Sequence, residues 1–258
     1  MEPNNTQSNN KRKKRKKSAS RVKRTAQSII ILCLAVIVAI SGWNLYKMTK
    51  DYRISKAIYD SIAELAMPQH EFDGEIDFEA LRKVNPDIVG WLYYADTHIN
   101  YPVVMGRDND QYLRLAFDGT WSINGSLFVD AVTWYPFQQF NTIVYGHHMQ
   151  DGSMFADFKK LKEYSFYEDH PQLELITPEG KFHLMICAFL NQPADSAIYY
   201  TNITDDAEKQ NYIDLVNSLA MYTTDQKMSI DDRLVVLSTC AYEYQDARYM
   251  VIARMVPW

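Results

Sequence analysis

The most hydrophobic segment of the chain lies near the N-terminus. From Ser28 to Tyr46 there is no charged residue, and Ile29–Ile40 is almost wholly aliphatic. At 1.5 Å per residue, a helix of about nineteen residues spans roughly 28 Å, enough for one membrane crossing. No convincing small-residue cleavage site follows, and Trp43 and Tyr46 are typical of a membrane interface. The pattern predicts an uncleaved transmembrane signal anchor at residues 28–46.

Charge gives the expected orientation of this anchor. Residues 11–24 contain ten Lys or Arg and no acid, so the positive-inside rule predicts a basic cytoplasmic tail at residues 1–27. A nucleic-acid-binding tail is the alternative for this basic run, but the adjacent apolar span favours the anchor. Omitting residues 1–24, with ten positive charges and one negative, changes the formal net charge from −5 to −14. We therefore expect no nucleic-acid partner for the remaining chain.

Residues 47–74 are predicted to form a helical stalk that leaves the membrane. Apolar residues recur at helical spacing, at Ile54, Ile58, Ile62 and Leu65. The stalk helix, Lys47–Met67, is expected to end at Pro68. A second, short helix is predicted over Phe72–Val84, with Asp77 as a candidate N-cap before Phe78.

From Ile88 onward the chain is predicted to be mainly β. The expected strands are short and rich in β-branched and aromatic residues: Ile88–Tyr94, Tyr101–Met105, Ser126–Val129, Asn141–Tyr145, Leu173–Thr177, Phe182–Leu190, Leu234–Leu237 and Tyr249–Val256. Asn124-Gly125 is a hairpin signal. Ser153–Leu161 favours a short helix, and Asp205–Tyr222 favours an amphipathic one with an acidic N-terminus. The pattern indicates a mainly β barrel with helices before it and one helix inserted late.

Three cysteines are too few for a disulfide scaffold, and their surroundings differ. Cys33 lies in the apolar span, and Cys187 lies in a segment that is apolar on both faces, which predicts a buried thiol. Cys240 ends the apolar run Leu234–Leu237 and has polar neighbours. A free thiol titrates near pH 8.5, so nucleophilic attack at neutral pH needs a base or positive neighbours. Cys240 is therefore the candidate nucleophile.

The groups that could assist Cys240 also lie at strand ends. Arg248 begins the last strand, where its planar guanidinium could bind a developing oxyanion. A surface salt bridge with Asp246 or Glu243 is the alternative role for this arginine. His147 and His148 follow the strand Asn141–Tyr145, and strand phase alone does not say which of them faces the site. No CxxC, HExxH, Walker loop, dinucleotide fingerprint or GxSxG occurs, so no metal or cofactor is expected.

These motifs together resemble the sortase family. Leu237-Ser238-Thr239-Cys240 is similar to the family's Leu-x-Thr-Cys strand end, and Arg248 lies where the family's arginine follows that cysteine. Asn141–His147 resembles the strand that delivers the family's histidine. The string Tyr145–Phe155, the string Ser238–Glu243, the inserted helix and the helices before the barrel resemble class B sortases in particular.

The resemblance implies a sortase-like closed β-barrel at residues 75–258, and the positive-inside rule predicts that this domain lies on the extracellular side of the membrane. It implies catalysis by Cys240, Arg248 and His147 rather than His148, with Ser238 and Thr239 as candidate substrate-binding residues. The expected partners are secreted proteins with a C-terminal sorting signal, cleaved after Thr in an Asn-Pro-x-Thr or Pro-x-Thr-Gly motif. A thioester acyl-enzyme would pass the acyl group to a cell-wall peptide amine. A hydrolysing cysteine peptidase and a non-enzymatic binding module are the alternatives.

Overall fold

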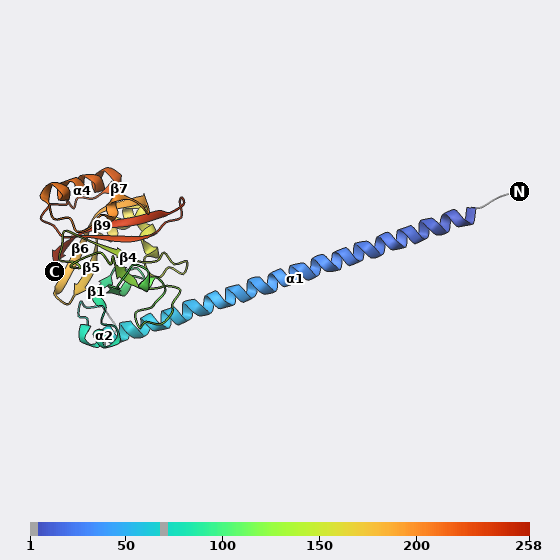
Figure 1. The fold of residues 1–258 in the computed structure, drawn as a ribbon, viewed down its shortest axis with the longest axis horizontal. Helices are drawn as coiled ribbons and strands as arrows, with labels where there is room; N and C mark the ends of the chain where they lie inside the picture. Colours follow the sequence, from blue (N-terminus) through green and yellow to red (C-terminus); the bar gives the residue numbers. More distant parts are fainter. Residues whose placement is uncertain (1–4, 68–71) are drawn as a thin grey trace. The chain divides into compact units, whose positions relative to one another are not determined.

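The computed structural model describes residues 5–67 and 72–258. Residues 1–4 of the predicted tail and residues 68–71 of the predicted stalk lie outside this range. The chain divides into two structural units, one ending at Lys50 and the other comprising Asp51–Trp258. Figure 1 shows the elements of both in sequence colours, and the second unit contains all of the strands that the structure describes.

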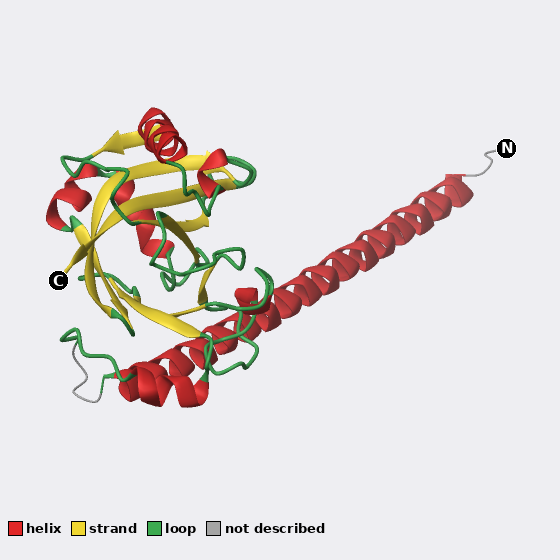
Figure 2. Ribbon diagram, turned by 60° about the vertical axis from the view of Figure 1, so that its left-hand side comes forward, coloured by secondary structure: helices red, strands yellow, loops and turns green. Residues whose placement is uncertain are grey.

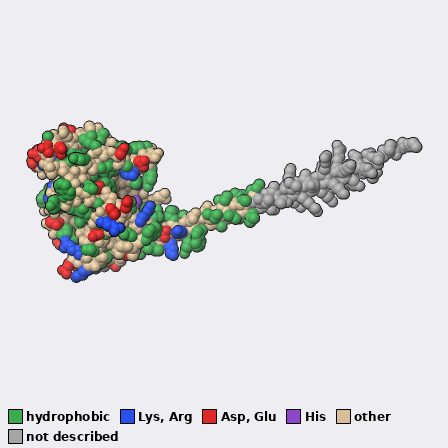
Figure 3. All heavy atoms as spheres, viewed as in Figure 1, with side chains coloured by type: hydrophobic (Ala, Val, Ile, Leu, Met, Phe, Trp, Pro, Cys, Tyr) green, Lys and Arg blue, Asp and Glu red, His purple; other side chains and the backbone are tan. Residues whose placement is uncertain are grey.

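Helix α1 (Asn5–Ala66) contains the predicted apolar span. From Ile30 onward it is long and apolar enough to cross a membrane, and none of the apolar window is buried. Side chains such as Leu32, Val38 and Trp43 are exposed. Figure 3 shows a green, hydrophobic stretch along the described part of this helix. Because exposed aliphatic side chains on a continuous helix suit an apolar surrounding rather than water, this helix fits a membrane anchor.

Within the described residues, eight strands close a barrel, and Figure 2 shows them wrapped around one interior. Their order is β5 (Gln172–Thr177), β1 (Ile88–Tyr93), β2 (Asn100–Val104), β3 (Leu127–Val129), β4 (Asn141–Tyr145), β8 (Leu234–Cys240), β9 (Ala247–Pro257) and β6 (Gly180–Pro193). The long strand β6 closes the barrel because it also pairs with β5. The β2–β3 and β4–β8 pairs are parallel and the others antiparallel. The predicted closed, mainly β barrel is confirmed.

Strand β8 is buried on both faces, which explains its unbroken apolar run. Val235 and Leu237 face the main core inside the barrel, whereas Leu234 and Val236 belong to a second core under the inserted helix. Because successive side chains of a strand point to opposite faces, a strand between two cores needs apolar residues at every position. The strand that ends in Cys240 is thereby held rigidly from both sides.

The predicted inserted helix is α4 (Asp206–Leu219), and it covers this second core. Asp205 is its N-cap, and the Asp205 side chain accepts hydrogen bonds from the backbone N–H groups of Ala207 and Glu208 at 2.9 and 3.1 Å. The predicted range was too long at its C-terminal end. Residues from Ala220 form strand β7 (Ala220–Thr223), which pairs with the edge of β6.

Two other helix predictions were wrong in extent or type. Helix α2 covers Phe78–Val84 rather than Phe72–Val84, and Asp77 is its N-cap, as predicted, accepting a hydrogen bond from Ala80 N–H. The segment expected as a short helix at Ser153–Leu161 is a 3₁₀ helix, η2 (Ala156–Lys162), followed by helix α3 (Tyr164–Asp169).

The predicted hairpin at Asn124-Gly125 is also wrong. This turn leads into β3. The strand before β3 in the chain is β2, and these two strands pair in parallel, so no hairpin forms. Gly125 has φ of +57°, and a Cβ there would lie 2.6 Å from the carbonyl oxygens of Tyr112 and Leu113. The glycine therefore lets the chain pack closely on the 3₁₀ helix η1 (Gln111–Leu113) rather than reverse a hairpin.

Candidate active site

Parallel pairing of β4 with β8 brings the histidine and cysteine segments together. Tyr145 pairs with Ser238 in this ladder, and Gly146 N–H donates to the Ser238 carbonyl at 3.1 Å. Parallel strands end at the same edge of a sheet, so the residues that follow each strand lie side by side. His147 and Cys240, each two residues beyond this last pair, therefore occupy the same end of the barrel.

Antiparallel pairing of β8 with β9 places Arg248 directly opposite Cys240. Directly opposed residues project from the same face of a sheet, so the guanidinium and the thiol share one side of the ladder. Arg248 Nη1 donates to the Ala247 carbonyl at 2.9 Å. Among the described residues it forms no ion pair with Asp246 or Glu243, so the alternative of a surface salt bridge is wrong.

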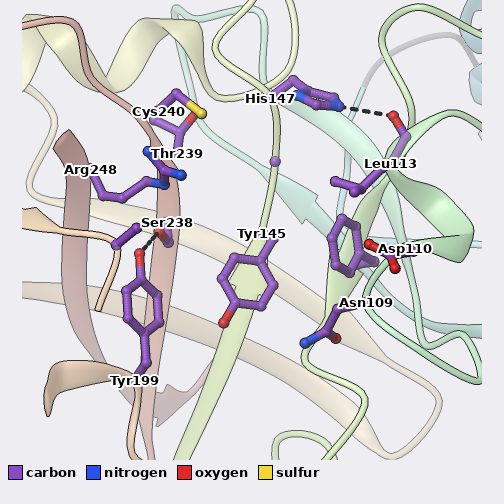
Figure 4. A pocket seen from close by; sticks show the side chains of 13 residues that line it. Asn109, Asp110, Leu113, Tyr145, His147, Tyr199, Ser238, Thr239, Cys240 and Arg248 are labelled. Carbon is purple, nitrogen blue, oxygen red and sulfur yellow. Dashed lines mark hydrogen bonds between the residues drawn. The ribbon is translucent and has the colours of Figure 1, made fainter. Parts of the chain in front are cut away.

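All five predicted site residues line one pocket of about 410 Å³, together with eight further residues. In Figure 4, Cys240 and His147 lie on opposite sides of one end of this pocket, with the sulfur directed toward the space between them. The complete lining is Asn109, Asp110, Leu113, Phe128, Tyr145, Gly146, His147, Ala194, Tyr199, Ser238, Thr239, Cys240 and Arg248. The sulfur, imidazole and guanidinium therefore share one cavity.

The His147 ring is held by a hydrogen bond between its Nε2 and the Leu113 carbonyl at 2.9 Å. Burial lowers the pKa of His147 below its ordinary value of 6.5, and the positive charge of Arg114 lowers it further. The hydrogen bond to Leu113 acts in the opposite direction but does not outweigh burial. A neutral imidazole is therefore favoured at neutral pH. Since a carbonyl only accepts, Nε2 carries the proton, and Nδ1 retains the lone pair that can take up another.

His148 points away from the pocket, as alternation along an extended chain requires. Its Nδ1 bonds to the Cys240 carbonyl oxygen at 2.7 Å, and its ring lies 5.0 Å from that of Tyr242. Tyr242 in turn donates to the His148 carbonyl at 3.0 Å. The second histidine is thus a backbone contact of the cysteine segment, whereas His147 presents its ring to the cavity.

Ser238 and Thr239 differ in what their hydroxyl groups contact. Ser238 Oγ bonds to Tyr199 OH at 2.7 Å, and this link fixes Tyr199 against β8. Thr239 is buried, and its Oγ1 has no hydrogen-bond partner among the residues that the structure describes. Both residues line the pocket, and their part in substrate binding stays a prediction.

The loop after Cys240 is fixed by Glu243. Burial opposes ionisation of this carboxyl, but hydrogen bonds from Tyr249 OH and Lys162 lower its pKa to about 2. The Lys162 Nζ to Glu243 Oε1 distance is 2.9 Å. Because this carboxylate stays ionised at neutral pH, it restrains the turn that connects Cys240 to Arg248.

Sequence reasoning missed most of the pocket wall beyond the five predicted residues. Tyr145 donates to Asp130 Oδ2 at 2.8 Å and stacks on Tyr199, with ring centroids 5.8 Å apart. Tyr199 ends a 3₁₀ helix, η3 (Ala197–Tyr199). Leu113 ends η1, and Asn109 precedes it in the same connection between β2 and β3. Tyr145 belongs to the motif that resembles the family's histidine strand, but residues of the connections, such as Tyr199, carry no local pattern that indicates a pocket.

Comparisons with known proteins give a consistent result. The sortase domain family matches residues 92–256. Sortase B of Staphylococcus aureus (strain NCTC 8325 / PS 47) is 30% identical over 92% of this chain and 98% of its own length. The solved Staphylococcus aureus sortase B–substrate complex superposes with a TM-score of 0.73 at 29% identity, covering 81% of this chain and 99% of that one. A solved sortase B in complex with triglycine gives a TM-score of 0.72 at 30% identity, and the match covers 80% of this chain and 98% of that one.

A closed mixed barrel with a cysteine, a histidine and an arginine around one pocket defines a cysteine acyltransferase of the sortase type. The chain belongs to the sortase family, with sortase B proteins among its relatives. It is therefore a cysteine transpeptidase, and the alternative of a non-enzymatic binding module is wrong.

Proposed function

We propose that this protein is a membrane-anchored sortase B-like transpeptidase. It cleaves a C-terminal sorting signal of secreted proteins after Thr and transfers the new carboxyl terminus to an amine of the cell-wall peptide. The observation that carries the proposal is the shared pocket of Cys240, His147 and Arg248 in a chain of this family. The substrate complex and the triglycine complex of related sortase B proteins support a peptide donor and a short amine acceptor.

The proposed mechanism uses the neutral state of His147. Its imidazole accepts the Cys240 proton as the sulfur attacks the Thr carbonyl carbon, and Arg248 hydrogen-bonds the oxyanion that forms. The C–N bond breaks, His147 returns the proton to the departing amine, and a thioester remains on Cys240. The acceptor amine then attacks the thioester, its proton passes through His147, and the thiol is regenerated.

The test uses the full chain in nanodiscs, a peptide with an Asn-Pro-x-Thr core and triglycine as the acceptor. We expect mass spectrometry to show an acyl adduct on Cys240 and a peptide whose Thr is joined to triglycine. A parallel reaction with a Pro-x-Thr-Gly peptide identifies the preferred motif. If only hydrolysed peptide formed with triglycine and with diaminopimelate-type amines, the hydrolytic peptidase would replace the transpeptidase.

We also propose an orientation, with residues 1–27 in the cytoplasm, the anchor at 28–46, the stalk at 47–74 and the catalytic domain at 75–258 outside. The basic run before the apolar span supports this arrangement. Protease added to intact cells should remove the catalytic domain while an N-terminal tag remains protected. A protected catalytic domain would show that the orientation is reversed.

Arg248→Lys should lower kcat by about 10²–10³-fold with little change in KM, because the cation is kept but the planar fork for the oxyanion is lost. Steady-state rates of peptide ligation measure the effect. Arg254→Lys is the matched control, since Arg254 is on the same strand and bonds to Gln226 rather than lining the pocket. Equal rates for Arg248→Lys and the wild type would show that the Arg248 guanidinium does not stabilise the oxyanion.

The acid limb of the pH profile should have its midpoint below pH 6.5. Only the neutral ring can accept the thiol proton, and burial lowers the pKa of His147, so the active form persists to lower pH than for a free histidine. Activity is then lost as pH falls through the lowered pKa. The measurement is kcat/KM against pH, with His148→Gln as the control that should leave this limb unchanged. A midpoint above 6.5 would contradict the neutral resting imidazole.

A further inference from the structure

The loop that follows His147 returns to the backbone of that residue. The Phe155 N–H donates to the His147 carbonyl at 3.0 Å, and His148 and Met154 form an isolated antiparallel bridge beside this bond. The loop is the second half of the string Tyr145–Phe155, which resembles class B sortases. The chemistry assigned to His147 uses only the start of this string, so the rest needs a separate explanation.

Met154 has an unusual backbone conformation for a residue with a side chain. Its φ is +55°, in the left-handed region, and its side chain is fully buried. Residues other than glycine seldom adopt this conformation, and it persists where the surrounding structure requires it. The Met154 N–H donates to the Tyr101 hydroxyl at 3.4 Å. The strained residue directly precedes Phe155, which is also fully buried.

The Phe155 ring packs directly against Gly146, the residue before His147. A Cβ on Gly146 would lie 2.6 Å from Phe155 Cδ2 and 2.5 Å from Leu127 Cδ2, which is closer than a side chain can approach. Gly146 is also bonded to β8, because its N–H donates to the Ser238 carbonyl. Only glycine therefore leaves room for the aromatic ring against this backbone.

Phe155 thus contacts the backbone around His147 in two ways, through its N–H and through its ring. The backbone position decides where the imidazole lies, and the imidazole is fixed in turn by its bond to the Leu113 carbonyl (Figure 4). A base must lie within hydrogen-bond reach of the proton that it takes up, and a misplacement of 1 Å can cost about 10²-fold in rate. The support of this backbone is therefore expected to affect catalysis.

We propose that Phe155 is a positioning residue for His147, and that Met154 and Gly146 have their conformation and size because they permit this contact. Phe155 lies outside the described lining of the pocket, so it acts through His147 and not on the substrate. The inference rests on the proposed function, because His147 is the base of the proposed mechanism.

The first test uses full-length protein in nanodiscs, with the folded fraction matched by circular dichroism. Gly146→Ala should lower kcat about 10²-fold and leave KM within about twofold. Gly180→Ala is the matched control, since a Cβ on this barrel glycine meets nothing closer than 3.4 Å, and it should leave kcat unchanged. Phe155→Leu should lower kcat about tenfold, and the double variant Gly146→Ala/Phe155→Leu should lose less than the product of the two single losses.

The second test distinguishes positioning of His147 from a general packing role. In a His147→Ala background, Gly146→Ala should change the residual rate by no more than about twofold, because the group that it displaces is gone. An undiminished 10²-fold loss in that background would overturn the proposal. So would an unchanged kcat in folded Gly146→Ala, a loss that appears in KM instead of kcat, or single losses that simply multiply in the double variant.

If the wild type cleaves no sorting peptide, the proposed function fails, and a measurement without substrate still decides the positioning role. Hydrogen–deuterium exchange at the imidazole C2 carbon, followed by mass spectrometry, reports the solvent access of each histidine ring. His147 should exchange faster in Gly146→Ala than in the wild type and Gly180→Ala, because displacement exposes a buried ring. His170, the C-cap of α3, should exchange equally in all three. Equal exchange of His147 in the three proteins would overturn the proposal.

Discussion

Cys240→Ala should lower turnover by about 10⁶-fold, the loss that typically follows removal of a catalytic nucleophile. Without the sulfur no thioester can form, and neither His147 nor Arg248 can supply a covalent intermediate. The measurement is the rate of triglycine ligation by full-length protein in nanodiscs, followed by chromatography of the peptide products. The acyl adduct on the peptide that contains residue 240 should disappear at the same time.

Cys187→Ala is the matched control for this substitution. Cys187 is buried and lies outside the active-site pocket, and burial raises the pKa of its thiol to about 12, which keeps it protonated and unreactive. Its replacement should leave turnover within a few fold of the wild type once the folded fraction is matched by circular dichroism. Full ligation activity in Cys240→Ala, or loss of activity in folded Cys187→Ala alone, would exclude the covalent mechanism at Cys240.

His147→Ala should be nearly as damaging, with a loss on the order of 10⁴-fold or more, because in the proposed mechanism the same ring takes up the thiol proton and delivers it to the leaving amine. His148→Ala should cost no more than about tenfold, equivalent to one ordinary hydrogen bond, here the bond to the Cys240 carbonyl. Two adjacent residues of one type thus provide an internal comparison, measured as kcat for ligation of the same peptide.

The difference between the two variants is the informative quantity. If both lost activity equally, the role of general acid and base could not be given to His147 alone. Imidazole added to the buffer offers a further check, since a cavity left in the pocket by His147→Ala can admit it. Partial recovery of His147→Ala, with none for His148→Ala, would match a ring that acts in proton transfer.

Several features of the fold could be predicted because their causes are local. Asp77 caps α2 through a bond to a backbone N–H group three residues away, and it was predicted as an N-cap from sequence. Asp205 caps α4 in the same local way, where the sequence predicted an acidic N-terminus. Predictions failed where a distant partner decides the structure. Residues 220–222 continue a helical pattern, but pairing with the edge of β6 makes them a strand. Asn124-Gly125 is a hairpin signal, but in the structure this turn packs closely against η1 and connects no hairpin.

The sequence by itself determined the apolar span after a basic tail, the strands that lead to His147 and Cys240, and the arginine that begins the next strand. Hydrophobic periodicity, charge and residue chemistry are properties of consecutive residues, so they can be read without coordinates. The tertiary structure decided that β4 and β8 run parallel in a register that brings these groups to one pocket, and that Tyr199, Asn109 and Leu113 complete it. Register and pocket walls depend on hydrogen bonds and packing between segments far apart in the chain, and no local pattern encodes them.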